Sequence, residues 1–140
     1  MDPLKRLGEL VERCISYERL RRENLKRLRL LYKLLKIDEK VPDFDELFAF
    51  GAINVAGLWL QKERFLEPQK NRYLQIIGIK KEDGRSKNVS LRYFGKAEAQ
   101  PSQTLRAVGE FVLRWRLEKS FLHLDSYREL IEKLEGLDGQ

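Results

Sequence analysis

The stretch Asn71–Gly95, NRYLQIIGIKKEDGRSKNVSLRYFG, carries the strongest folding signal in the chain. Two runs rich in β-branched and aromatic residues flank the dipeptide Asp83-Gly84. Asp-Gly favours a type I′ turn, because both central residues of that turn need a positive φ. The stretch therefore predicts an antiparallel β-hairpin, and counting outward from a regular turn places Tyr73 directly opposite Phe94.

Side chains alternate between the two faces of such a hairpin. One face is apolar and is expected to join the core, with Leu74 and Ile76 beside Val89, Leu91 and Tyr93. The other face mixes aromatic, aliphatic, amide and basic groups. It is predicted to carry Tyr73, Gln75, Ile77 and Ile79 on the first strand and Phe94, Arg92, Ser90 and Asn88 on the second.

This second face has the composition of a platform for single-stranded nucleic acid. Bases stack on aromatic rings for roughly 1–3 kcal/mol each, and basic groups around the rings hold the phosphates. Arg92 suits either task, because a guanidinium both stacks on bases and binds phosphate through two hydrogen bonds. The basic residues available around the hairpin are Arg72, Lys80, Lys81, Arg85, Lys87 and Lys96.

Two structural alternatives stay open for this face. A cross-strand aromatic pair is a common stabiliser of sheets, and a helix of the same chain could cover it. The register is a second uncertainty, since a bulge at Gly84 would move Tyr73 to the face of Leu91 and Tyr93.

Residues 3–36 are expected to form one long helix, with Asp2 as its cap and Pro3 in its first turn. Its leucines recur at heptad spacing. A helix of this length measures about 50 Å, which exceeds the width of a 140-residue globule. Part of it must therefore pack on something outside its own domain, and self-association through helices is expected.

The basic run at residues 17–36 allows other interpretations, a helix along a phosphate backbone or on an anionic membrane. We favour the solvated side of an amphipathic helix whose leucines pack on a partner. No membrane association is expected.

The remaining segments complete an α+β domain spanning residues 1–140. Pro42-Asp43 begin a short apolar helix within residues 38–61, which continues as buried helix or turns into a strand. Phe65–Pro68 is expected to be a short edge strand, so that antiparallel strands occupy residues 62–96. Residues 102–136 are predicted to form two helices, separated at Asp125-Ser126, where Ser126 starts a capping box.

Trp59 and Arg64 are further candidate nucleic-acid contacts. Tryptophans are usually mostly buried, and Trp115 is expected to be a core or subunit contact. Trp59 is the better ligand candidate of the two, because Lys62, Arg64 and Phe65 follow it closely.

The composition excludes several classes of site. A single cysteine and a single histidine exclude an internal disulfide framework and the multi-cysteine or histidine-rich metal patterns. Two or three of the acidic residues between Asp38 and Glu46 could hold a divalent metal or act as an acid/base pair, but Asp43 and Asp45 are interpreted as helix caps. No phosphate-binding glycine loop or catalytic motif is present, so no cofactor, metal or catalysis is expected. The chain lacks a long apolar segment and a signal core, and a cytoplasmic location is expected.

Net charge and composition point toward polyanion partners. The net charge is +6, and residues 1–36 and 62–96 each hold an excess of six positive charges. Abundant charged residues with one cysteine and one methionine are typical of proteins from very hot environments. A small basic α+β chain of this composition, with an aromatic and basic sheet face and long leucine-rich helices, resembles the archaeal single-stranded DNA-binding proteins called ThermoDBP and their related proteins. The resemblance implies a fold other than the OB-fold, an aromatic cleft flanked by basic residues, and assembly through helices.

Two functional hypotheses follow. The first is a non-catalytic protein that binds single-stranded DNA or RNA, most simply DNA, as a helix-mediated homo-oligomer. The second is a helical adaptor, or a small subunit of a larger ribonucleoprotein or viral assembly, whose leucine-rich helices meet a different protein.

Overall fold

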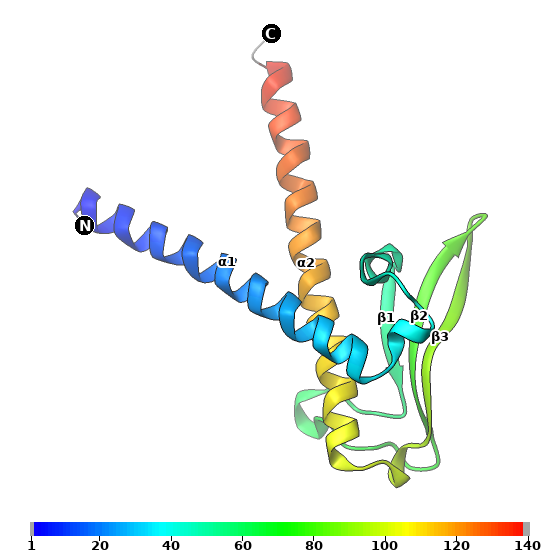
Figure 1. Cartoon of the computed structure of the whole chain (residues 1–140). Helices are drawn as coiled ribbons and strands as arrows, with labels where there is room; N and C mark the ends of the chain where they lie inside the picture. Colours follow the sequence, from blue (N-terminus) through cyan, green and yellow to red (C-terminus); the bar gives the residue numbers. More distant parts are fainter. Residues whose placement is uncertain (1, 139–140) are drawn as a thin grey trace.

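The computed structural model describes residues 2–138, apart from the side chains of residues 14 and 15. Two long helices, α1 (Pro3–Leu34) and α2 (Ser102–Asp138), accompany a three-stranded antiparallel sheet (Figure 1). The expected α+β class is confirmed. The sheet order is β1-β2-β3, with β1 at Ala52–Ala56, β2 at Tyr73–Glu82 and β3 at Arg85–Lys96. Four short 3-10 helices lie at Ile37–Glu39 (η1), Phe44–Ala49 (η2), Lys62–Arg64 (η3) and Ala97–Ala99 (η4).

The long N-terminal helix begins as the sequence predicts. The carboxylate of Asp2 accepts a hydrogen bond from the Leu4 amide at 3.1 Å, and Pro3 occupies the first turn. Just past the end of the helix, Lys36 adopts a left-handed conformation with φ 58° and turns the chain into η1. Among the side chains of α1 that the structure describes, the buried ones lie in its second half, such as Leu28 and Leu31, and Leu35 just past its end is buried too.

Residues 38–61 form a short helix that turns into a strand, the second of the two expected alternatives. Asp43 caps η2 by accepting a hydrogen bond from the Asp45 amide at 3.1 Å. The strand β1 follows and pairs with β2.

The prediction of a strand at Phe65–Pro68 was wrong. That segment makes one isolated bridge, between Leu58 and Pro68. Leu66 lies in the left-handed region with φ 65°, which interrupts extended backbone. Pro68 also has no amide hydrogen to donate to a ladder.

The C-terminal segment is one continuous helix, so the predicted break at Asp125-Ser126 is wrong. The Asp125 carboxylate forms an ion pair with Arg21 of α1 at 2.8 Å instead of capping a new helix. No proline interrupts α2, and its hydrogen-bond ladder runs through the capping-box residues.

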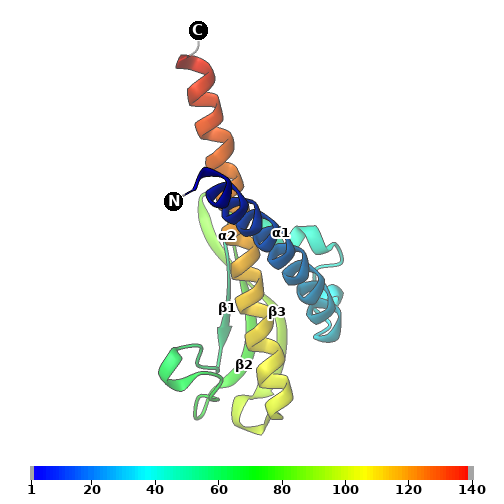
Figure 2. The same cartoon turned by 90° about the vertical axis from the view of Figure 1, so that its left-hand side faces the viewer.

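Both helices lie on the same side of the sheet (Figures 1 and 2). The core fills the space between the helices and the sheet. Ile53, Leu74 and Ile76 face the helices from the sheet. Trp115 is buried as expected, and its indole N–H donates to the Leu47 carbonyl at 2.9 Å. Gly78 lets Phe50 pack directly on β2, because a Cβ there would lie 2.6 Å from the ring.

The two helices diverge beyond the point where they cross, as Figure 1 shows. We call residues 3–20 the α1 arm and residues 121–138 the α2 arm. Many large apolar side chains on both arms are exposed. They are Leu4, Leu7, Leu10, Val11, Tyr17 and Leu20 on the α1 arm, and Leu124, Tyr127, Leu130, Ile131, Leu134 and Leu137 on the α2 arm.

Candidate nucleic-acid interface

The hairpin forms at the predicted turn. Asp83 and Gly84 have φ values of 51° and 77°, as a type I′ turn requires. The pairing is regular from Glu82 opposite Arg85 to Ile77 opposite Ser90. Two irregularities follow toward the open end of the hairpin, and they leave Leu91 and Phe94 without a partner on β2.

These bulges overturn the predicted register beyond Ser90. Tyr73 pairs with Lys96 and not with Phe94, while Gln75 pairs with Tyr93. Each bulge inserts one extra residue and so resets the alternation of side chains between the faces. Arg92 lies opposite Ile76, on the helix side of the sheet, and Phe94 packs partly against the core. The predicted face therefore loses Arg92 and Phe94.

The sheet surface turned away from the helices, which we call the outer face, carries a different aromatic pair. Tyr73 and Tyr93 are each 53% exposed, and their ring centroids lie 6.0 Å apart at a tilt of 30°. Beside them the Gln75 amide donates to the Ser90 hydroxyl at 2.6 Å. Both helices lie on the opposite side of the sheet (Figures 1 and 2). The pair is thus open to a flat ligand.

Tyr93 is the residue that the sequence prediction missed, since regular alternation assigned it to the core. The glycine two residues later was the available signal. Gly95 has φ 97°, and a glycine inside a strand pattern often marks a bulge.

The rest of the outer face is mostly neutral. Its partly exposed apolar members are Ile77 and Ile79 on β2, with Ala52 and Ala56 on β1. Asn54, Asn88 and Ser90 add exposed polar groups by the same pairing. The face offers amides and hydroxyls beside two rings.

The predicted basic residues divide between the two sides of the sheet. Lys96 lies opposite Tyr73 and shares its face, and the exposed Arg72 directly precedes β2. Lys80 and Lys87 pair with each other on the helix side. There the Lys80 ammonium lies 4.7 Å from the Phe50 ring centroid, and Lys87 is 3.8 Å from Glu82.

Trp59 and Arg64 contact each other. The Arg64 guanidinium lies 4.5 Å from the Trp59 ring centroid, and its Nε is 3.2 Å from Glu67. The guanidinium therefore occupies one face of the Trp59 ring. These two residues form a cluster of their own in the segment between β1 and β2.

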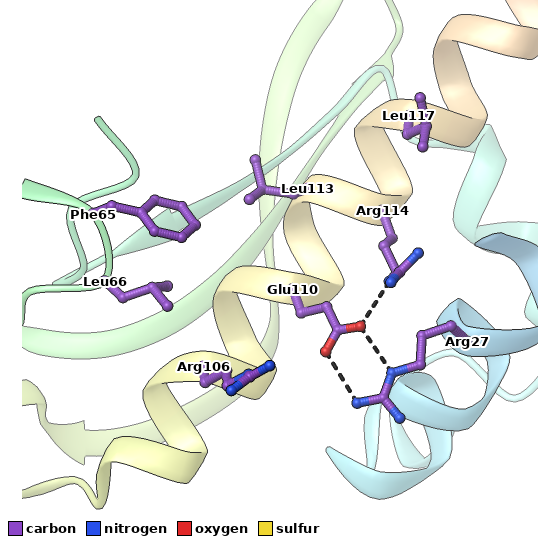
Figure 3. Close-up of a pocket in the computed structure, with 8 residues that line it drawn as sticks. All are labelled: Arg27, Phe65, Leu66, Arg106, Glu110, Leu113, Arg114 and Leu117. Atoms are coloured by element: carbon purple, nitrogen blue, oxygen red, sulfur yellow. Dashed lines mark hydrogen bonds and ion pairs between the residues drawn. The ribbon is translucent and has the colours of Figure 1, made fainter. Parts of the chain in front are cut away.

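A hollow of about 650 Å³ lies along α2 and is shown in Figure 3. Phe65, Leu113 and Leu117 supply apolar walls, and Glu110 faces Arg27 and Arg114. Hydrogen bonds from Arg27 at 2.8 Å and Arg114 at 2.7 Å lower the pKa of Glu110 to about 2. Glu110 is therefore ionised at neutral pH and clamps α1 to α2.

A second carboxylate lies at the crossing of the two helices. Glu118 is only 2% exposed, and Arg21 donates to it at 2.6 Å. Burial raises the pKa of Glu118, while the hydrogen bond from Arg21 opposes that shift. Burial also lowers the pKa of Lys119, whose ammonium donates to the Phe48 carbonyl at 2.5 Å. These charges join the helices to each other and to η2.

Among the side chains that the structure describes, no three His, Cys, Asp or Glu residues gather as a metal site would require. None of the described helices has both the length and the apolarity needed to cross a bilayer. Comparisons with protein-family models, curated proteins and solved structures gave no match.

Proposed function

We propose that the chain is a non-catalytic protein that binds single-stranded nucleic acid, most simply DNA, on the outer face of its sheet. The observation that carries the proposal is the pair of half-exposed rings, Tyr73 and Tyr93, on a sheet face that neither helix covers. Unpaired bases have free π faces, whereas the bases of a duplex are already stacked on each other. Stacking on such rings therefore favours single strands.

The residues around the two rings suit the base edges and the phosphates of a nucleic-acid strand. Gln75, Ser90 and Asn88 offer hydrogen bonds to base edges without selecting a sequence. Lys96 and Arg72 lie at the tyrosine end of the face, where they meet phosphates. Lys81, exposed on the same face of β2, extends the positive charge toward the turn.

The direct test is a titration of fluorescein-labelled oligothymidine with the purified protein, followed by fluorescence anisotropy. We expect binding to the single strand and much weaker binding to a duplex of equal length. The logarithm of the affinity should fall linearly with the logarithm of salt concentration, with a slope of about −0.7 for each phosphate contacted. Equal affinity for the duplex, or no binding at low salt, would refute the platform.

We further propose that the exposed arms assemble copies of the chain into a homo-oligomer. On α2 a stripe with alternating spacings of four and three residues continues from the folded body into the arm, the pattern of a coiled-coil seam. α1 is basic overall and the α2 arm is acidic. Pairing α1 of one copy with the α2 arm of another would bring opposite charges together. The stripe consists of Leu113, Leu117, Ser120, Leu124, Tyr127, Ile131 and Leu134.

Replacing Ile131 and Leu134 together by glutamate is expected to convert the oligomer into monomer. Both residues are more than half exposed, so the change leaves the core intact and puts charges in the seam. Light scattering coupled to size exclusion measures the mass. The matched control is Ser126→Glu with Gly136→Glu, which adds the same two charges to the α2 arm at exposed positions off the stripe and keeps the arm acidic. A wild-type chain that is already monomeric would contradict this assembly.

The exposed arms also favour one alternative, a helical adaptor whose arms meet a different protein. The same two measurements separate the alternatives. A stable homo-oligomer that binds oligothymidine supports the first proposal. A monomer or an aggregate that ignores oligonucleotides supports the adaptor.

A further inference from the structure

A groove runs along the free edge of β3 on the helix side of the sheet. Two adjoining hollows of about 460 and 320 Å³ form it, and Lys36, Arg92 and Tyr93 line both of them. The end of α1 and the first turn of α2 supply the opposite wall, through Leu34, Gln103 and Thr104. The groove is separate from the outer face but begins at the same tyrosine, Tyr93.

Arg92 reaches this groove because of the bulge at Leu91, which turns the arginine to the helix side. Its guanidinium carbon lies 5.1 Å from the Phe94 ring centroid. Its Nε is buried and has no hydrogen-bond partner within the described part of the chain. Buried N–H groups of guanidinium are nearly always paired, so this atom is short of an acceptor. The other cations that line the groove are Lys36 and Lys40, and an ammonium group cannot accept a hydrogen bond.

The charge in the groove is mostly positive. Lys36 lies where the two hollows meet, on the left-handed turn just after α1, and Lys40 lines the smaller hollow. Within residues 2–138 as described, no carboxylate comes within 4 Å of the cationic nitrogens of Arg92, Lys36 or Lys40. Glu39 is the acidic group among the lining residues. Three cations thus share a concave surface with one carboxylate.

Polar groups that hold the groove in shape are already paired. The Gln100 amide donates to the carbonyls of Phe94 and Lys96, at 2.8 and 3.2 Å. These bonds fix the bulged end of β3 against the start of α2, so Arg92 and Phe94 keep their position. Gln103 and Thr104 remain available as neutral donors in the lining.

We infer that this groove is a phosphate-binding site. Guanidinium is suited to phosphate because it donates two parallel hydrogen bonds, and a lysine adds a mobile second charge. The phosphate is either an internal diester of a bound strand or a terminal monoester. The assignment to a bound strand rests on the proposed function, since a strand stacked on Tyr73 and Tyr93 can pass over the edge of β3 into the groove. The phosphate site itself does not depend on it.

Two variants and one control test the inference. Arg92→Met keeps an apolar stem on Phe94 and removes the guanidinium. Lys36→Asn removes an exposed charge and keeps a residue that tolerates the left-handed conformation. Lys87→Gln is the matched control, because it removes one charge at the far tip of the hairpin. Calorimetric titration uses deoxyadenosine monophosphate, and anisotropy uses oligothymidine with and without a 5′-phosphate.

We expect each groove variant to weaken monophosphate and oligothymidine binding about tenfold or more, as loss of a charged hydrogen bond implies, while Lys87→Gln changes little. Each groove variant should also make the salt slope shallower by about 0.7. A 5′-phosphate that raises wild-type affinity assigns the site to a strand end, and equal affinities assign it to an internal diester.

The failures of the two proposals are distinguishable. Wild-type affinities and salt slopes in both groove variants would refute phosphate binding in the groove, without contradicting strand binding on the outer face. Monophosphate binding that depends on Arg92 and Lys36, with no binding of oligothymidine, would sustain the groove and refute the strand-binding function. No phosphate binding by the wild-type chain would overturn the groove.

Discussion

Replacing Tyr73 and Tyr93 together by alanine is expected to weaken oligothymidine binding by about 2–6 kcal/mol at constant salt. Each ring offers one stacking surface, and a stacked base contributes roughly 1–3 kcal/mol. No charge is removed, so the salt slope should keep its wild-type value. Anisotropy titrations of the double variant at two salt concentrations measure both quantities.

Folding provides the control for this result. Both tyrosines are half exposed, and a cross-strand pair contributes only about 0.2–1 kcal/mol to a sheet. The thermal midpoint of the double variant should therefore stay close to that of the wild type. Phe65→Ala removes a half-exposed ring that lies away from the outer face and from both arms, and it should leave the affinity unchanged. A double variant at Tyr73 and Tyr93 that unfolds would show that the pair is a sheet stabiliser instead.

The hairpin shows what local sequence chemistry predicts well. The Asp83-Gly84 turn needs two positive φ values, and this requirement depends on neighbouring residues only. The helix start at Asp2-Pro3 and the cap at Asp43 are local in the same sense, and both formed as predicted. Turns and helix starts that depend on a few neighbouring residues therefore lie where the sequence predicts them.

The candidate site could be predicted only in part, because its geometry depends on packing across the sheet. Alternation around a regular turn assigned Tyr73 and Gln75 to the outer face correctly. The same alternation assigned Arg92 and Phe94 to that face and Tyr93 to the core, and it failed at the bulges. Leu91 lies in the core as alternation predicts, but the extra residue at the bulge turns Arg92 to the helix side as well, and the strand sequence does not reveal the distant helices that pack there.

The continuity of α2 has a similar cause. Asp125 and Ser126 are good capping residues, and local preference favours a break there. The carboxylate instead binds Arg21, which lies 104 residues earlier in the chain. A contact between residues so far apart could not be read from either segment alone.

The charge cluster at the crossing of the helices leads to the second large prediction. Arg21→Met is expected to lower the free energy of unfolding by about 3 kcal/mol. Arg21 is 31% exposed, whereas the Glu118 carboxylate it binds is 2% exposed. The substitution leaves Glu118 buried without its cation, and the uncompensated charge is the main source of the loss. Urea denaturation at neutral pH measures it.

Glu118→Gln is the informative comparison. It removes the buried charge together with the ion pair, and Arg21 keeps Asp125 at 2.8 Å, so the loss should be clearly smaller than for Arg21→Met. The double variant Arg21→Met with Glu118→Met should recover most of the stability, because neither charge remains. A double variant as unstable as the sum of the single ones would contradict this account.

The pH dependence of Arg21→Met gives an independent test of the same cause. Burial already raises the pKa of Glu118, and loss of the Arg21 hydrogen bond should raise that pKa further. A carboxyl whose pKa is higher in the folded state than in the unfolded state binds its proton more tightly when folded. Stability therefore increases as the pH falls through the folded-state pKa toward the unfolded value. Relative to wild type, the deficit of Arg21→Met should shrink between neutral pH and about pH 5. A deficit that stays constant over this range would assign the loss to packing of the arginine stem and not to the charge of Glu118.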